Sequence, residues 1–199
     1  MLWKLNNMVQ DAKGRTIAKY KGVLKGDKVI VPSIDESRAL YKLGFFGKFL
    51  GKDKIKIEEV DSVNSQIHLS PLEALYLVEL GLLEVVDDDS VVDKDTLREL
   101  VEKRYEHGEL VYELYRYFRD RGYVVRSGLK FGSLYAVYEK GPGIDHAPML
   151  VHLIDPGRNI TALDVTRAAR LSHTVRKTFV LAVRHMNSLK LIGFEWWTP

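Results

Sequence analysis

Residues 127–154 read SGLKFGSLYAVYEKGPGIDHAPMLVHLI, and residues 169–183 read ARLSHTVRKTFVLAV. The first stretch holds short runs of β-branched and aromatic residues that are separated by glycine-rich segments, which predicts strands joined by turns. Residues 161–175, TALDVTRAARLSHTV, have helical spacing instead, and Thr161 can cap that helix. A helix set between strand-like runs predicts a domain of the α+β or mixed α/β class.

The segments on either side extend this pattern. Apolar residues at helical spacing across 95–120 predict two helices, with Gly108 between them and Gly122 ending the second. The runs at 123–132, 134–140, 149–155, 178–185 and 189–197 predict strands. The second half is therefore predicted to form a domain with helices packed on a mixed sheet.

The first half predicts a smaller α/β domain. Residues 16–32 indicate short strands broken by glycine turns. A helix is predicted to follow, with Ser33 as its cap, Glu36 three residues on and Gly44 at its end. Residues 44–68 predict a long loop with one strand at 54–60. Ser70, Pro71 and Glu73 begin a second helix. Charge and periodicity change near 88–95, after an acidic turn at 87–90, so we predict domains at 1–92, with an inserted loop at 49–68, and at 93–199.

Composition indicates a globular protein. Hydrophobic residues make up 46% and charged residues 29% of the 199 residues. No apolar run is long enough to predict a membrane span, and the first residues lack the apolar core of a signal peptide. The chain has no cysteine, which excludes disulfides and thiolate metal sites. We therefore expect a cytoplasmic protein without a membrane partner.

Positive charge gathers in the second half. Residues 1–100 contain 15 Lys and Arg against 17 Asp and Glu, whereas residues 101–199 contain 15 against 10. The net charges are thus −2 and +5. The second half is the better candidate for contact with an anion such as RNA, although a solvated surface gives the same imbalance.

Common catalytic motifs are absent. The sequence has no GxxxxGK[ST], GxGxxG, GxSxG or HExxH motif, and its six histidines show no close metal-ligand pairing. We therefore expect no metal and no cofactor, and chemistry by proton transfer alone. Cleavage of RNA by its own 2′-hydroxyl needs a base, an acid and a cation. Histidine suits the acid and Lys or Arg the cation, whereas a tyrosine base needs nearby positive charge because its ordinary pKa is about 10.

The segments quoted at the start resemble the catalytic domain of tRNA-intron endonucleases. The shared features are a GLKFG-type strand pair, a Tyr that ends a strand, a His after a short loop, and a Lys in an RLSHTVRK segment. LYKLGFFGK and LSPLEALYL in the first half are similar to the N-terminal domain of that family. The resemblance implies an enzyme of archaeal tRNA splicing that cleaves precursor tRNA at a bulge–helix–bulge, leaving a 2′,3′-cyclic phosphate and a 5′-hydroxyl.

The resemblance also implies a role for each matching residue. Tyr138 would be the general base, His146 the general acid and Lys177 the cation that stabilises the transition state. Arg170 would stack on a base flipped out of the bulge. LKLIGFEWW has no arginine for a second stacking position.

Alternatives to the three catalytic residues remain within the same segments. Tyr135 is the rival for Tyr138, although a packing role suits it better. Arg176 and Lys130 are the rivals for Lys177, since alternation on a strand sends only one of two successive side chains to a given face. His173 is better explained as a capping or packing group, and His152 as a core or interface histidine.

The sequence departs from simpler family members in two places. The insert at 49–68 resembles the extra loop of crenarchaeal-type catalytic subunits. Lys52 and Lys54 near its start, with Lys48 directly before it, would contact RNA phosphates. The turn at 184–190, RHMNSLK, lacks the acids that dock self-assembling members. We therefore expect a smaller structural paralogue with an acidic turn to complete an α2β2 heterotetramer. A non-catalytic structural or RNA-binding subunit and a metal-dependent nuclease are the alternative functions.

Overall fold

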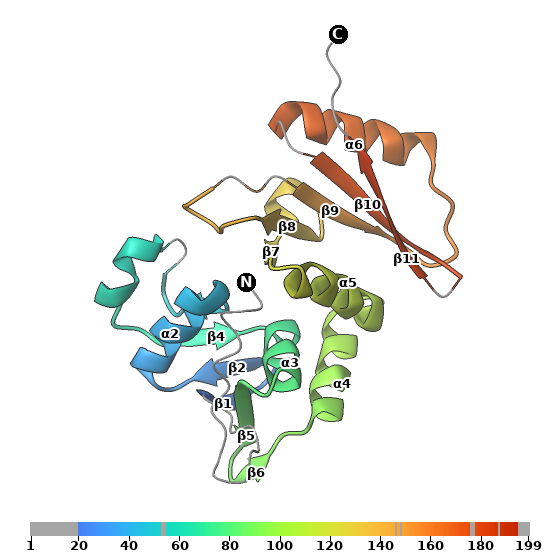
Figure 1. Cartoon of the computed structure of the whole chain (residues 1–199). Helices are drawn as coiled ribbons and strands as arrows, with labels where there is room; N and C mark the ends of the chain where they lie inside the picture. Colours follow the sequence, from blue (N-terminus) through green and yellow to red (C-terminus); the bar gives the residue numbers. More distant parts are fainter. Residues whose placement is uncertain are drawn as a thin grey trace. The chain divides into compact units, whose positions relative to one another are not determined.

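The computed structural model describes residues 20–52, 55–145, 147, 149–175, 178–186 and 188–194, with side chains omitted at 168, 169 and 171–175. The chain divides into two compact units, Met1–Arg116 and Tyr117–Pro199 (Figure 1). Each unit contains one mixed sheet with helices packed on it, so the predicted mixed α/β class is confirmed. None of the described helices is long and apolar enough to cross a membrane.

The first unit has a six-stranded sheet in the order β3-β4-β2-β1-β5-β6. Strands β1 and β5 are parallel, and the other neighbours are antiparallel. The strand bounds are β1 Tyr20–Lys25, β2 Lys28–Val31, β3 Lys48–Phe49, β4 Ile67–Leu69, β5 Leu83–Asp87 and β6 Ser90–Val91. The predicted short strands before the first helix and the turn at 87–90 are both confirmed in the described part of the chain.

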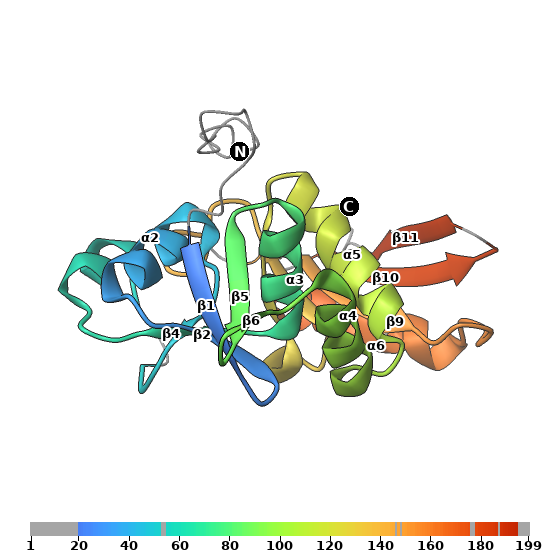
Figure 2. The ribbon, with the colours of Figure 1, turned by 90° about the horizontal axis from the view of Figure 1, so that it is seen from below.

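The helices of this half begin at the predicted caps. The Ser33 hydroxyl accepts from the Glu36 amide at the start of α2 (Ile34–Gly44). Ser70 and Glu73 form the expected capping box of α3 (Pro71–Glu79). Two further helices follow, α4 (Lys94–Arg104) and α5 (Gly108–Asp120). Helices α3 and α4 pack against each other, and Figure 2 shows them side by side.

The expected strand at 54–60 is wrong. Residues Ile57–Ser62 instead form a 3₁₀ helix, η1, which packs on α2. The alternation of apolar and charged residues suggested period two, but the buried positions follow period three, with Val60 0% and Val63 5% exposed. In a 3₁₀ helix residues three apart lie on one side. The Lys42 ammonium also pairs with Asp61 at 2.6 Å, which ties η1 to α2.

Gly108 separates α4 from α5 through close packing. A Cβ at Gly108 would lie 2.8 Å from both the Glu102 Cα and the Val101 carbonyl oxygen. Only glycine therefore lets the start of α5 approach the α4 backbone. The division into compact units falls within α5, and α4 belongs to the first unit. The domain boundary at 92/93 stays a prediction.

The second unit has a five-stranded sheet in the order β11-β10-β9-β8-β7. Its strands are β7 Val124–Ser127, β8 Tyr135–Tyr138, β9 Met149–Ile154, β10 Thr178–His185 and β11 Ser188–Phe194. Strands β9 and β10 are parallel neighbours joined through α6 (Ala162–Val175), and the other pairs are antiparallel. Helix α6 packs on β10 and β11 (Figure 1). Buried side chains of β8, β9 and β10, including Leu150, Ile154 and Leu181, form the core beneath it.

The GLKFG segment closes the hairpin between β7 and β8. Residues Leu129–Phe131 form one 3₁₀ turn, η2, and Gly132 follows with a φ of 68°, which favours glycine. Gly128 is needed for space, because a Cβ there would lie 2.5 Å from the Ser133 hydroxyl oxygen and 2.7 Å from the Tyr135 carbonyl carbon. Gly128 and Gly132 thus fix the hairpin register that places Tyr138 opposite Val124.

Candidate active site

The ends of three neighbouring strands lie side by side at one end of the second sheet. Val137 of β8 pairs with Met149 of β9, and Met149 pairs with Thr178 of β10. These three residues form a row across the sheet, about 10 Å long at the usual strand spacing. Strand β8 ends at this row, whereas β9 and β10 begin there, because β8 is antiparallel to β9 and β10 is parallel to it (Figure 1). Segments distant in sequence therefore lie close together at this end of the sheet.

Tyr138 is the last residue of β8, as the family resemblance implies, whereas the residue pattern predicted a strand that continues to 140. Its side chain is partly buried, whereas its rival Tyr135 is buried, at 5% exposure. Tyr135 pairs with Val151 in the middle of the sheet, where it packs in the core. A phenol must reach its substrate to accept a proton, so the structure favours Tyr138 over Tyr135 for this role.

The surroundings of Tyr138 keep its phenol protonated at neutral pH. Burial raises the pKa of Tyr138 above its ordinary value, and the Asp145 carboxylate raises this pKa further. The Arg126 guanidinium acts in the opposite direction. Arg126 lies on β7 two residues from Val124, the partner of Tyr138, and thus on the same face of the sheet.

A short loop leads from Tyr138 toward β9. The Asp145 carboxylate accepts hydrogen bonds from three successive backbone amides of this loop, those of Glu139, Lys140 and Gly141. Gly141 and Gly143 have φ values of 133° and 86°, which favour glycine. The loop is therefore a closed turn built around one carboxylate.

Several predicted residues lie outside the described part of the chain. These are His146 and Lys177, together with the rival Arg176 and with Lys54 of the insert. Tyr138 is thus the described member of the three predicted catalytic residues. Lys130, the other rival for the cation, is exposed on η2, where its ammonium lies 4.8 Å from the centroid of the Phe131 ring.

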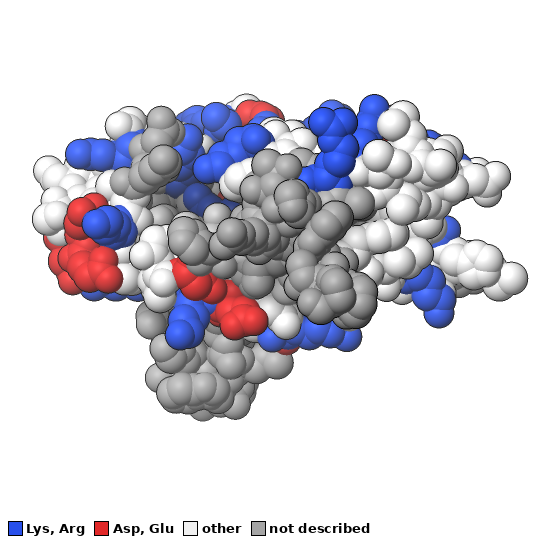
Figure 3. Space-filling model, turned by 90° about the horizontal axis from the view of Figure 1, so that it is seen from above, with Lys and Arg blue, Asp and Glu red and all other residues white. Residues whose placement is uncertain are grey.

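Arg170 is exposed on α6, the helix that leads toward β10. The N-terminus of α6 is fixed by a reciprocal cap, in which the Asp164 amide donates to the Thr161 hydroxyl and the Thr161 amide donates to the Asp164 carboxylate. Arg158 pairs with Asp164 at 2.8 Å. Hydrogen bonds from Thr161 and the charge of Arg158 lower the pKa of Asp164 to about 2. Figure 3 views the molecule from the side of α6 and shows exposed basic groups there.

The remaining basic candidates lie in the first unit. Lys48 on β3 and Lys52 just after it are both exposed. The insert returns to the sheet at β4, which pairs with β3 through Lys48 and His68. The described part of the insert thus leaves and rejoins one edge of the six-stranded sheet.

Two further histidines, His152 and His185, lie on β9 and β10. The His152 ring stacks on Phe179 at 6.3 Å, and burial lowers the pKa of His152. This agrees with the predicted packing role. His185 is exposed at the end of β10. Within the described residues, no group of three His, Asp or Glu side chains is placed to hold a metal ion.

The turn between β10 and β11 has no acidic side chain in the sequence. The pairing of β10 with β11 ends at His185 and Ser188, and Met186 directly follows β10. Met186 is 84% exposed and has a φ of 51°. An exposed thioether at this tip cannot form an electrostatic contact with a basic cleft.

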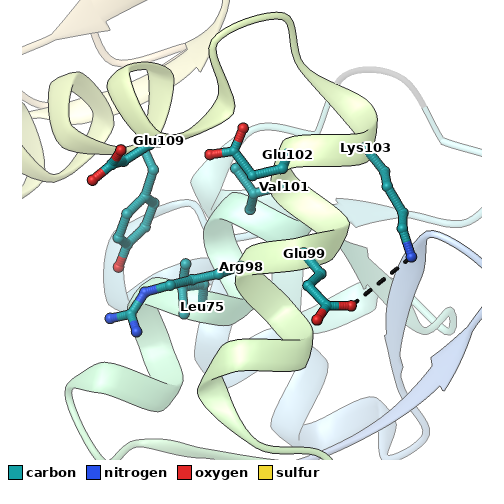
Figure 4. Close-up of a pocket in the computed structure, with 8 residues that line it drawn as sticks. Leu75, Arg98, Glu99, Val101, Glu102, Lys103 and Glu109 are labelled. Atoms are coloured by element: carbon teal, nitrogen blue, oxygen red, sulfur yellow. Dashed lines mark ion pairs between the residues drawn. The ribbon is translucent and has the colours of Figure 1, made fainter.

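A groove of about 420 Å³ lies in the first unit. Leu75 and Val101 form part of its apolar wall, and Glu102 and Glu109 lie on neighbouring helices at its rim (Figure 4). Its lining residues are Leu75, Arg98, Glu99, Val101, Glu102, Lys103, Glu109 and Tyr112. None of them was predicted to act on RNA.

Comparison with known proteins matches both halves of the chain. Residues 20–98 match the N-terminal domain of the tRNA intron endonuclease, and residues 109–190 match its catalytic C-terminal domain. The chain belongs to the tRNA intron endonuclease family. The resemblance seen in the sequence is thereby confirmed.

Curated relatives within this family are similar over most of their length. The tRNA-splicing endonuclease of Pyrobaculum arsenaticum is 51% identical over 179 residues, which cover 88% of this chain and 98% of the relative. That of Hyperthermus butylicus is 45% identical over 82% of this chain and 89% of its own. That of Sulfurisphaera tokodaii is 37% identical over 88% and 97%.

Two residues near Tyr138 were missed by sequence reasoning. Arg126 lies twelve positions upstream, and only the hairpin register places it near the phenol. Asp145 directly precedes His146 in a Gly/Pro/Asp segment, where an acid is an ordinary turn residue. Three hydrogen bonds to one carboxylate cannot be anticipated from spacing.

Proposed function

We propose that this chain is the catalytic subunit of a tRNA-splicing endonuclease that cleaves precursor tRNA at its intron boundaries. The observation that carries the proposal is the row Val137–Met149–Thr178. Tyr138 follows the first of these residues, and the sequence places Lys177 directly before the last. His146 belongs to the short segment that leads into β9. Membership of the family and the names of the relatives support the same activity.

The reaction needs no group beyond these side chains. The phenolate form of Tyr138 accepts the proton of the 2′-hydroxyl, whose oxygen attacks the adjacent phosphorus. The bond from phosphorus to the 5′-oxygen breaks, and His146 donates a proton to that leaving oxygen. Lys177 balances the extra negative charge on the phosphoryl oxygens. The products are a 2′,3′-cyclic phosphate and a 5′-hydroxyl.

Positive charge is required to make Tyr138 a base. The carboxylate of Asp145 and burial both oppose ionisation of the phenol, and Arg126 favours it. Lys177 directly precedes Thr178, the first residue of β10, and only β9 lies between β10 and β8. The Lys177 ammonium would therefore add a second cation at the same end of the sheet. This is a physical reason to prefer Lys177 over Lys130, whose ammonium lies over Phe131 on η2.

RNA recognition divides between the two units. Arg170 is exposed on α6, where a planar guanidinium can stack on a base flipped out of a bulge. Lys48 and Lys52 are exposed at the start of the insert, and with Lys54 they would bind phosphates and release counterions. Shape and flipped bases, rather than base sequence, would then select the bulge–helix–bulge.

Cleavage in excess EDTA tests the proposal against its alternatives. The chain is mixed with a bulge–helix–bulge RNA, with and without a smaller paralogue from its source, and the product ends are mapped. Full cleavage in EDTA with a 2′,3′-cyclic phosphate is the expected result. Loss of cleavage in EDTA would indicate a metal-dependent nuclease. No cleavage with any partner would indicate a structural subunit.

The cytoplasmic location also stays a prediction.

A further inference from the structure

One carboxylate closes the loop between β8 and β9. Asp145 Oδ2 accepts from the Glu139 and Lys140 amides at 3.1 and 3.0 Å, and Oδ1 accepts from the Gly141 amide at 2.8 Å. The Asp145 amide in turn donates to the Gly141 carbonyl at 3.1 Å. Hydrogen bonds to an ionised acceptor are about twice as strong as neutral ones, so this turn resists opening.

The two ends of this loop are the chain neighbours of two proposed catalytic residues. Glu139 directly follows Tyr138, and Asp145 directly precedes His146. The bond from the Glu139 amide to Asp145 Oδ2 therefore joins one end of the loop to the other. Without it, the five residues from Lys140 to Ile144, two of them glycines, could adopt many conformations.

We propose that Asp145 is a positioning residue, which holds the chain position directly before His146 against the backbone that follows Tyr138. The inference rests on the proposed function, because it gives Asp145 a role only through the residues on either side of the loop. Asp145 does not touch the RNA in this proposal and transfers no proton.

Positioning and electrostatics predict opposite effects for removal of the charge. The Asp145 carboxylate raises the pKa of Tyr138, so a neutral side chain there would by itself increase the fraction of phenolate, the form that accepts a proton, and speed cleavage. A loop that has lost one of the two acceptor oxygens of Asp145 would instead misplace the acid. A misplacement of about 1 Å can slow a reaction about a hundredfold. The sign of the change in rate therefore separates the two roles.

The test uses Asp145→Asn in the full-length chain, within the assembly that cleaves RNA. The amide side chain keeps the shape of the carboxylate but leaves it one acceptor oxygen. We expect single-turnover cleavage to slow by about ten- to a hundredfold with an unchanged RNA Kd. Hydrogen exchange should speed up at the amides of 139–141. Glu139→Gln is the matched control, because it removes one charge from the same loop at an exposed side chain and should leave the rate unchanged.

Combination with His146→Ala shows whether Asp145 acts through its neighbour. We expect Asp145→Asn to have little further effect in the His146→Ala chain, since an absent acid cannot be misplaced. An equal loss in both backgrounds, or a faster reaction in Asp145→Asn alone, would overturn the inference while the proposed function stands. A wild-type rate in His146→Ala would overturn the assigned acid and this inference together. Should Asp145→Asn not fold, Asp145→Ser, which retains one acceptor oxygen, takes its place in the same cycle.

Discussion

At the scale of single residues, the protonation of Tyr138 is set by charges on the strand and loop beside it. Arg126 favours the phenolate, and Asp145 with burial disfavours it. The proposed base is therefore not ionised in the isolated chain at neutral pH. Any step that adds positive charge at this sheet edge would activate it.

The first prediction concerns His146. In His146→Ala we expect cleavage to slow by about 100- to 10,000-fold, because the protonated imidazole acts only in the transition state. RNA binding should be nearly unchanged. The measurements are single-turnover cleavage and an RNA titration. His185→Ala removes an exposed histidine from the end of β10 and serves as the control. Equal losses of binding and rate would mean that His146 holds the substrate.

Arg126 gives a prediction about pH. Its guanidinium lowers the pKa of Tyr138, so Arg126→Gln should raise that pKa further. Less phenolate is then present at each pH below the pKa, and the rising limb of the rate–pH profile should move to higher pH. Arg121→Gln is the matched control, because Arg121 lies over the Tyr117 ring at 3.6 Å instead. An unshifted limb would show that another group is the base.

At the scale of elements, caps and turns decide where the helices stand. Ser33, Ser70 and Thr161 were predicted as caps, and each is one. These signals are local, so the sequence is enough to find them. The 3₁₀ helix η1 was missed because its buried side, with Val60 and Val63, depends on packing against α2. Arg126 and Asp145 were missed for a similar reason, since pairing and loop closure bring them to Tyr138.

The cap of α6 can be tested by stability. In Thr161→Ala the Asp164 amide loses its acceptor, and the free energy of unfolding should fall by about 1 kcal/mol. Denaturant unfolding monitored by circular dichroism measures this. Thr166→Ala removes a hydroxyl of the same helix that donates to the Ala162 carbonyl and caps nothing. It should leave stability almost unchanged, and an equal loss in both variants would contradict the capping role.

Asp164 adds a pH dependence to the same helix. Its folded pKa of about 2 lies below the ordinary value of 3.8, so its contribution is fully present above pH 3.8 and is lost as pH falls toward 2. Unfolding curves across this range should show a loss of stability that is absent in Asp164→Asn. Asp155→Asn, a neighbouring acid at the end of β9, is the comparison. The same acid dependence in Asp164→Asn would assign it to other groups.

The lysines at the start of the insert make a prediction about salt. Replacing Lys48, Lys52 and Lys54 by Gln should weaken RNA binding and reduce the slope of log Kd against log salt by about 2 to 3. Binding titrations at several salt concentrations measure the slope. The matched control replaces Lys21, Lys25 and Lys28, which are exposed on the β1–β2 hairpin. The same change of slope in both triple variants would mean that the insert has no special contact with RNA.

At the scale of the whole molecule, the prediction concerns how subunits assemble. The turn at 184–190 has no acid, and Met186 is exposed at its tip. We predict that the chain alone is at most a dimer and nearly inactive. A smaller paralogue with an acidic turn should produce an α2β2 tetramer that cleaves RNA and dissociates as salt rises. Light scattering and cleavage measured together test this. A fully active homotetramer would show that the turn docks through apolar contacts.

The row from Val137 to Thr178 also has a consequence for the order of events during synthesis. The ribosome makes β8 and β9 well before β10, and Met149 can pair with Thr178 only after the whole of α6 has emerged. Such pairing between distant segments is slow compared with local helix formation. A nascent chain would therefore carry the proposed catalytic tyrosine before the proposed catalytic lysine, and cleavage could begin only after β10 has paired with β9.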